Sequence, residues 1–234
     1  MTHATDSPAP PSSPASPVSP ASPVSPVSPA SPASPASIDQ LAEELVAADG
    51  SVRARALGEL VRRGERSTPA LVRALDSRDV DVRVRAAQGL GEIADPANAE
   101  LFVAMLEDRD DRIRARGAQG LARLGDPRAL GALVRTIDDF EDVAHAPGTL
   151  SSYALAGMGP AALVAVAPLL SAPGPMTRQR AFQVVQKIVS ELLGAGEFVA
   201  RWREMGTYDP ASDSPRREAA AAQWRAWIAR TFVR

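Results

Sequence analysis

Pairs of arginines recur along the chain, and their type and spacing suit binding chemistry better than any other residues in the sequence. Each pair has the form Arg-x-Arg and lies in one of four similar segments: Val52–Leu57, Val82–Ala87, Ile113–Ala118 and Thr177–Phe182. The first three segments are 30 and 31 residues apart, and the fourth follows 64 residues after the third. Because a guanidinium holds several donors in a fixed fork, the pattern predicts repeated sites for carboxylates, phosphates or carbonyl oxygens.

Residues that could form a catalytic or metal centre are few. The chain has no cysteine, which excludes disulfides, thiolate metal ligands and a cysteine nucleophile. Its two histidines, His3 and His145, are far apart, and the sequence contains no Gly-rich phosphate loop and no nucleophile elbow. We therefore predict no catalytic, cofactor-binding or metal-binding residues, no bound cofactor, and a protein that is not an enzyme.

One acidic cluster is a further candidate site. It consists of Asp138, Asp139, Glu141, Asp142 and His145. These residues lie in the longest predicted internal loop, and long loops often carry function. Three interpretations remain open: a metal or catalytic site, a loop that contacts a partner, and a solvated insertion.

The paired arginines lie on predicted helices. Apolar residues recur at helical spacing in the second segment, at Val82, Ala86, Leu90 and Ile93. Another amphipathic helix is predicted ahead of each segment, such as Asn98–Glu107 or Arg128–Ile137. Aspartates such as Asp79 and Asp110 come just before the arginine-bearing helices, where carboxylates suit the positive end of the helix dipole. Each unit is therefore predicted to be a pair of antiparallel helices.

Two sequence motifs carry a family resemblance: Asp81–Gly91, which reads Asp-Val-Arg-Val-Arg-Ala-Ala-Gln-Gly-Leu-Gly, and Gly125–Leu130, which reads Gly-Asp-Pro-Arg-Ala-Leu. They resemble HEAT repeats, and among these the bacterial subfamily named after phycobilisome lyase subunits. The resemblance covers residues 38–193. It implies an all-α fold, a right-handed α-solenoid of about five HEAT-like helical hairpins. Most members of this subfamily are interaction scaffolds, and only a few take part in bilin attachment.

The fourth repeat departs from the pattern. Leu150–Met158 keeps the apolar spacing but has lost both arginines, and Tyr153 stands where the second arginine is expected. The turn before it, residues 138–148, is enlarged.

The two arginines of each pair point about 200° apart on a helix, so they are expected to have different roles. The first arginine of each pair is expected to lie between helices, at Arg53, Arg83, Arg114 and Arg178. The family resemblance implies that these side chains bond to turn carboxylates, such as Asp81 or Asp110, in a ladder along the stack. Their predicted role is structural.

The second arginine of each pair is expected to face solvent, on the concave side that second helices line in HEAT-like stacks. Together with polar residues on the same helix faces, this predicts a partner-binding set: Arg55, Arg85, Gln88, Arg116, Gln119, Arg123, Tyr153, Arg180, Gln183 and Lys187. Arg62 adds a positive charge to this face, and Glu92 adds a negative one. Two interpretations remain open: an ordinary solvated helix face, or a basic strip that binds an acidic or phosphate-bearing partner.

The two ends of the chain differ from the repeats. Residues 1–37 carry 11 of the 21 prolines, in a Ser-Pro-Ala or Ser-Pro-Val pattern with too little apolar surface to offset the entropy of ordering. They predict a disordered N-terminal tail, which is either a spacer or a docking or phosphorylation segment. Residues 194–234 are predicted to form C-terminal capping helices, in which Trp224 and Trp227 either close the core or present an aromatic binding surface.

Charge and hydropathy narrow the function classes. The formal net charge is −2 with a single lysine, which disfavours a binding mode dominated by nucleic-acid phosphates. No apolar run approaches the roughly 18 residues of a membrane span, and no signal peptide is visible, so we expect a cytoplasmic protein without a membrane partner. The predicted function is a non-catalytic scaffold that binds an acidic protein or peptide through the basic concave face. A bilin lyase-like or isomerase-like subunit and a nucleic-acid-binding HEAT-like protein remain as alternatives.

Overall fold

The structure, a computed structural model, describes residues 36–141, 148–212 and 215–233, and most of them are helical. Residues 1–35, which make up nearly all of the predicted disordered tail, lie outside the described residues. Within the described ranges no β-strand occurs, and Glu141 and Thr149 form an isolated bridge. The predicted all-α class is confirmed.

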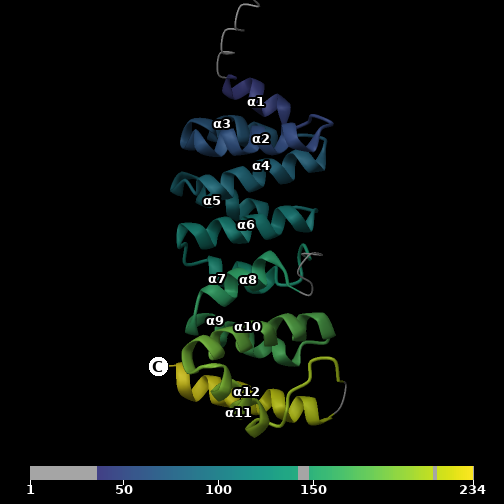
Figure 1. The fold of residues 1–234 in the computed structure, drawn as a ribbon, viewed down its shortest axis with the longest axis vertical. Helices are drawn as coiled ribbons and strands as arrows, with labels where there is room; N and C mark the ends of the chain where they lie inside the picture. The colour runs from purple at the N-terminus through teal and green to yellow at the C-terminus, as the bar shows by residue number, and fades with distance from the viewer. Residues whose placement is uncertain (1–35, 142–147, 213–214, 234) are drawn as a thin grey trace, which may run out of the picture. The chain divides into compact units, whose positions relative to one another are not determined.

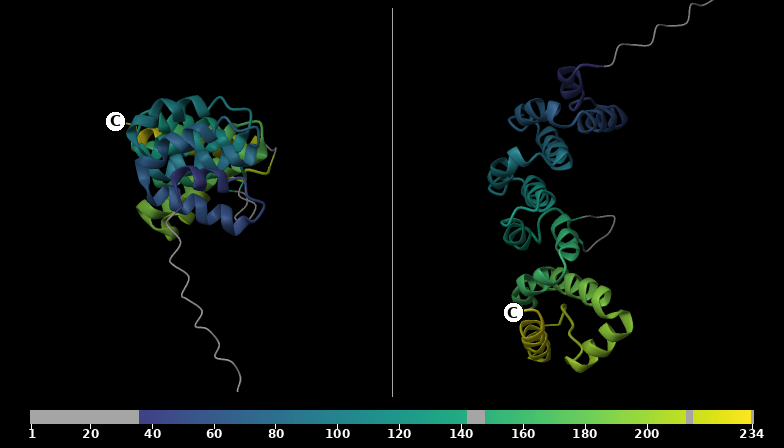
Figure 2. Two further views of the ribbon diagram at one scale, coloured as in Figure 1. Left: turned by 90° about the horizontal axis from the view of Figure 1, so that it is seen from above. Right: turned by 90° about the vertical axis from the view of Figure 1, so that its left-hand side faces the viewer.

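Helical hairpins follow one another in chain order (Figures 1 and 2). Their first helices are α1 (Ile38–Glu44), α3 (Thr68–Ala74), α5 (Ala99–Met105), α7 (Ala129–Arg135) and α9 (Pro160–Val166). Their second helices are α2 (Gly50–Arg62), α4 (Val80–Ile93), α6 (Asp111–Leu124), α8 (Leu150–Gly157) and α10 (Pro175–Leu193). Short 3-10 helices adjoin three of the first helices, at Gly64–Ser67, Pro96–Asn98 and Ala167–Ser171. Each first helix packs on the second helix of its hairpin, and successive second helices pack on one another, so the described part of the chain is an α-solenoid of five hairpins.

Aspartates begin the second helices, as their positions in the sequence predict. Asp49, Asp79 and Asp110 are the N-caps of α2, α4 and α6. Each side chain accepts a hydrogen bond from the backbone N–H two residues further on, at 2.7, 2.8 and 3.0 Å. The cap satisfies a donor that the helix itself leaves unpaired. In the fourth hairpin Thr149 takes this place and accepts from the Ser152 N–H.

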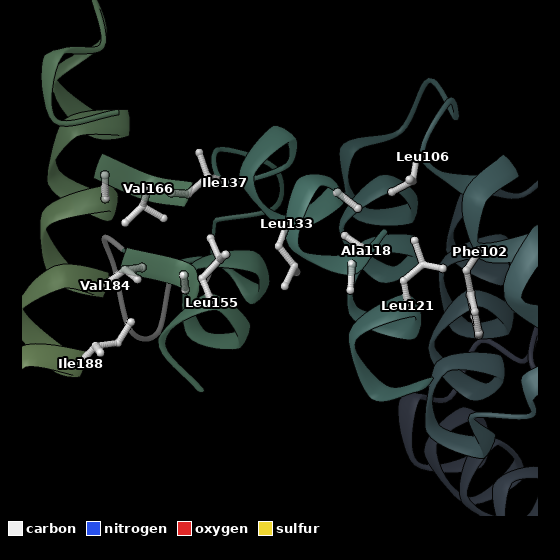
Figure 3. Close-up of a cluster of buried hydrophobic side chains, with 14 of the residues drawn as sticks. Phe102, Leu106, Ala118, Leu121, Leu133, Ile137, Leu155, Val166, Val184 and Ile188 are labelled. Atoms are coloured by element: carbon white, nitrogen blue, oxygen red, sulfur yellow. The ribbon is translucent and has the colours of Figure 1, made fainter. Parts of the chain in front are cut away.

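One apolar core runs through the hairpins. Figure 3 shows its middle section, where Phe102, Leu121, Leu133, Leu155 and Val184 line up from α5 to α10. All five side chains are buried. Each hairpin buries its apolar face only against the neighbouring hairpins. The core is therefore complete only when the hairpins are stacked.

Glycines on α6 allow this helix to pack closely against α5. A Cβ at Gly120 would lie 2.5 Å from the ring of Phe102, and a Cβ at Gly117 would lie 2.7 Å from the Phe102 carbonyl oxygen. Both glycines and Phe102 are buried. Side chains at these positions would push the two helices apart, so glycine is needed here for packing.

The helix α8 is shorter than its counterparts because its sequence stops it early. It ends at Gly157, where α4 and α6 continue for a further turn or more. Gly159 follows with φ of 66°, a conformation that favours glycine, and Pro160 then begins α9. The long helix α10 therefore extends past the end of α8.

Two further helices, α11 (Ala195–Glu204) and α12 (Pro215–Phe232), follow the last hairpin. Trp224 is fully buried and packs against Phe182 of α10, with ring centroids 5.9 Å apart. Tyr208 is also buried and donates a 2.6 Å hydrogen bond to the Leu170 carbonyl. Of the two interpretations of the C-terminal tryptophans, the structure supports the cap, because Trp224 and Trp227 are both buried.

Candidate partner-binding face

The first arginine of each pair binds the turn that precedes its own helix. Nη1 of Arg83 donates to the carbonyls of Ser77 and Arg78 at 2.9 and 3.3 Å. The same pattern, to the carbonyls six and five residues earlier, recurs at Arg53, Arg114 and Arg178. The implied ladder to turn carboxylates is wrong at Asp81, which pairs with Arg112 at 2.9 Å, and at Asp110, which is the N-cap of α6. It is present at Arg114, which binds the turn carboxylate of Asp139. The structural role of the arginines stands, and the acceptors that all four share are backbone carbonyls.

Arg114 adds a bond to the next hairpin. Its Nε and Nη2 donate to the two carboxylate oxygens of Asp139 at 2.7 and 2.9 Å. This bidentate pair raises the pKa of the Arg114 guanidinium, chiefly through the hydrogen bonds that it donates to Asp139. One residue of the acidic cluster therefore serves as a structural link.

The other described residues of the acidic cluster are also bound to neighbours. Asp138 accepts from the Thr177 hydroxyl at 2.6 Å and pairs with Arg180 at 2.8 Å. Glu141 pairs with Arg180 at 3.2 Å. These contacts give the carboxylates a role in joining the hairpins. The two remaining members, Asp142 and His145, lie outside the described residues.

Arg180 is a correction to the predicted face. Sequence periodicity places it among the solvent-facing arginines, but it is only 4% exposed. The enlarged turn before α8 brings Asp138 and Glu141 onto its guanidinium, a contact between residues about 40 positions apart. The expected exposure of Arg180 is therefore wrong.

We call the second-helix face the set of repeat-equivalent residues on the outer sides of α4, α6, α8 and α10. It comprises Arg85, Gln88 and Glu92 on α4; Arg116, Gln119 and Arg123 on α6; Tyr153 and Ala156 on α8; and Gln183 and Lys187 on α10. All of these side chains are at least partly exposed. Because α4, α6, α8 and α10 contact one another in this order, the residues form one row across the hairpins.

Three arginines on this face have no carboxylate within ion-pair distance among the described residues: Arg85, Arg116 and Arg123. Arg85 donates to the Leu45 carbonyl at 3.3 Å, and Arg123 donates to the Gly91 carbonyl at 3.0 Å. Both carbonyls lie at helix ends, where the helix leaves acceptors unpaired. The two side chains are thus held in place by the neighbouring hairpin while their charge is not neutralised.

Arg116 lies in a drier environment than the other two. It is partly buried, its Nη1 donates to the Gln119 side-chain oxygen at 3.1 Å, and its guanidinium lies 6.0 Å from the centroid of the Phe140 ring. Burial lowers the pKa of this guanidinium, nearby Arg123 lowers it further, and Glu92 opposes the shift. Its Nε is buried without a hydrogen-bond partner among the described residues. An anion close to this guanidinium would offset the cost of burying its charge.

The other predicted cations have partners on their own surface. Arg55 pairs with Glu44 at 2.6 Å, Arg62 pairs with Glu59, and Lys187 pairs with Glu191 at 2.8 Å. These pairs are exposed and contribute little to stability, but they cancel charge locally. The positive field of the second-helix face therefore centres on α4 and α6.

A groove of about 620 Å³ opens beside this basic region, between α8 and α10. It exists because α8 ends at Gly157 while α10 continues. Its lining consists of Ser152, Tyr153, Ala156, Gly157, Gln183, Val184, Gln186, Lys187, Ser190 and Glu191. Three of these, Tyr153, Gln183 and Lys187, are among the residues predicted from the sequence, and the structure brings them together around one hollow.

The remaining lining residues are not apparent from the repeat pattern. The sequence does contain one signal, the run Gly157-Met158-Gly159-Pro160, which predicts an early helix end. Tyr153 is 50% exposed, and its hydroxyl lies so close to Gly148 that a Cβ there would collide with it. Gly148 therefore makes room for the aromatic ring at the edge of the groove.

Comparison with known families agrees with the repeat pattern. The model for HEAT repeats matches residues 38–111 and again residues 68–147. Residues 38–147 therefore carry HEAT repeats. The motifs Asp81–Gly91 and Gly125–Leu130 both lie inside the matched range, so the predicted resemblance to HEAT repeats is confirmed. No curated protein sequence matches the chain significantly.

Solved structures similar to this chain include designed armadillo repeat proteins. The complex of CpcE and CpcF of phycocyanin lyase from Nostoc sp. PCC7120 is 20% identical, with a TM-score of 0.46, over 85% of this chain and 79% of that chain. A designed armadillo repeat protein in complex with the peptide (KR)4 is 16% identical, with a TM-score of 0.38, over 82% of this chain and all of that chain. An engineered protein is 17% identical, with a TM-score of 0.40, over 82% of this chain and 96% of that chain.

Residues 36–141, 148–212 and 215–233 include no group of three or more His, Asp or Glu residues placed to hold a metal ion. In the same described ranges, no helix is both long enough and apolar enough to cross a bilayer. The second-helix face brings arginines and a groove together in this part of the chain.

Proposed function

We propose that this chain is a non-catalytic scaffold that binds an acidic polypeptide segment across α4 and α6. The observation that carries the proposal is that Arg85, Arg116 and Arg123 lie on neighbouring helices with no carboxylate partner among the described residues. A solenoid face that is charged and already ordered is a common working surface of repeat proteins.

The spacing of the arginines suits an extended chain. Arg85 and Arg116 occupy equivalent positions on helices that pack together, and packed helices lie about 8–10 Å apart. This distance corresponds to about three residues of extended peptide. It is also close to the Debye length of about 8 Å at physiological salt, so the charges add to one field and favour rapid encounter with an acidic ligand.

The arginines also limit the entropy cost of binding. Arg85 and Arg123 are each anchored through one guanidinium nitrogen to a helix-end carbonyl, which leaves their other donors available. Because the side chains are already ordered, less conformational entropy is lost when a carboxylate arrives. Arg116 gains most from such a partner, since burial disfavours its charged form and a nearby carboxylate would favour it.

The test uses the full chain and a library of displayed random 12-residue peptides. We expect the selected peptides to be rich in Asp and Glu and to bind more weakly as salt is raised. In the variant Arg85→Gln/Arg116→Gln/Arg123→Gln, binding should weaken at least about tenfold, since glutamine keeps a donor but removes the charge. Circular dichroism and urea unfolding verify that the variant is folded.

The matched control removes the same charge from exposed arginines elsewhere, with Arg78→Gln/Arg109→Gln/Arg230→Gln, and should bind as the parent does. Equal binding by the parent and the first variant would refute the proposal. Preferential binding of duplex DNA over acidic peptide at the same ionic strength would instead favour a nucleic-acid ligand.

A further inference from the structure

We infer that the groove between α8 and α10 holds one large apolar side chain of the same acidic segment that the arginines of α4 and α6 bind. This inference rests on the proposed function and specifies its partner further. The ligand is then a segment with two features, carboxylates and, at a fixed distance from them, an aromatic or aliphatic anchor.

The chemistry of the groove favours an uncharged, apolar group. Ala156, Val184 and the ring of Tyr153 supply apolar wall, and the nearby cation Lys187 is neutralised by Glu191 at 2.8 Å. A carboxylate would gain little electrostatic energy beside this neutral ion pair, whereas apolar surface is stabilised by its removal from water. The volume of about 620 Å³ lies within the usual range of ligand pockets, about 300–1,000 Å³.

The groove is continuous with the basic part of the second-helix face. Tyr153 occupies in α8 the repeat position of Arg116 in α6, and Ala156 occupies that of Gln119. Because α8 contacts both α6 and α10, a chain that crosses α4 and α6 in the direction of the C-terminal hairpins next reaches the groove. Along this row, tyrosine and alanine on α8 replace the arginine and glutamine of α6. We therefore expect the surface to bind carboxylates at α4 and α6 and an apolar side chain next to α8.

The helix spacing sets the expected separation of the two features. The distance from Arg116 on α6 to the middle of the groove is about one and a half helix spacings, or about 12–15 Å. An extended peptide covers this distance in about four residues. The ligand should therefore carry two acidic residues about three positions apart and an apolar anchor about four positions beyond them.

The experiment uses the full chain and fluorescein-labelled peptides of Gly and Ser that carry two glutamates three positions apart and one Trp four positions further on. A second peptide has Ala in place of the Trp, and a third has the Trp next to a glutamate. All three are made in both chain directions, and fluorescence anisotropy gives each dissociation constant. We expect the first peptide to bind at least about tenfold more tightly than the other two in one direction.

The groove variant is Gly157→Leu, which fills the hollow without displacing the backbone, since a Cβ at Gly157 meets no atom within 4 Å. Its matched control is Gly131→Leu on α7, where a Cβ also meets no atom within 4 Å. We expect Gly157→Leu to remove the tenfold gain from Trp and Gly131→Leu to leave it unchanged.

The outcomes separate the two proposals. If the glutamate peptides bind through the arginines but Trp adds nothing, or if Gly157→Leu keeps the gain, the groove inference is overturned and the proposed function stands. If Trp peptides bind in the groove with no dependence on the glutamates or the three arginines, the groove is supported and the acidic-segment function is overturned. If none of the peptides binds, both are overturned.

Discussion

Removal of the guanidinium from the first arginine of each pair should destabilise the hairpins to different degrees. Arg83, Arg114 and Arg178 make the same two bonds to the preceding turn, but they differ in burial and in further partners. Substitution by methionine keeps most of the apolar stem and removes the charged donors, so the three variants report mainly on the lost hydrogen bonds.

The contacts of the three arginines rank the losses of folding stability that we expect for the three variants. One acceptor of Arg83, the Arg78 carbonyl, is in an exposed bond that water can replace, so Arg83→Met should cost about 1 kcal/mol. Arg114→Met also leaves Asp139, whose side chain is 16% exposed, without its partner, and should cost about 2–3 kcal/mol. Arg178 is 2% exposed and bonds in addition to the Pro210 carbonyl at 2.8 Å, so Arg178→Met should cost about 3 kcal/mol or more.

Urea unfolding followed by circular dichroism measures these costs, with hydrogen exchange to detect hairpins that open separately in a repeat protein. A double-mutant cycle of Arg114→Met with Asp139→Asn should give a coupling of about 1–2 kcal/mol. Equal costs for the three arginines would refute the ranking by burial and partners. A coupling near zero would refute the link between Arg114 and the loop before α8.

Two further predictions test the packing. Gly120→Ala should destabilise the fold by about 1–3 kcal/mol, because its Cβ would collide with the Phe102 ring, whereas Gly58→Ala, with no atom within 4 Å, should stabilise it by up to about 1 kcal/mol in the same urea assay. Burial raises the pKa of Tyr208 to about 12, so the unfolded chain loses this proton at a lower pH than the folded one, and stability should fall as pH rises from 10 to 12. The fall should be smaller in Tyr208→Phe, and an equal slope in the two proteins would contradict the burial of the neutral phenol.

The sequence alone determined the repeat architecture. Helical periodicity, the aspartates before each second helix and the recurring arginine pairs are local signals, and short-range geometry suffices to interpret them. The direction of Arg85, Arg116 and Tyr153 away from the apolar stripe of each helix follows in the same way, because the angle between residues on a helix is fixed. The same reasoning could not identify the carbonyl acceptors of the first arginines, since these depend on how closely the preceding turn folds back.

Tertiary structure decided which of the outward-facing residues remain open to a ligand. Arg180 has the same helix position as Arg85 and Arg116, yet it is buried because the enlarged turn lays Asp138 and Glu141 on its guanidinium. The groove likewise depends on the difference in length between α8 and α10, which matters only once the two helices lie side by side. Periodicity fixes where a side chain points from its own helix, but exposure, charge pairing and cavity depend on distances to segments that are remote in the sequence.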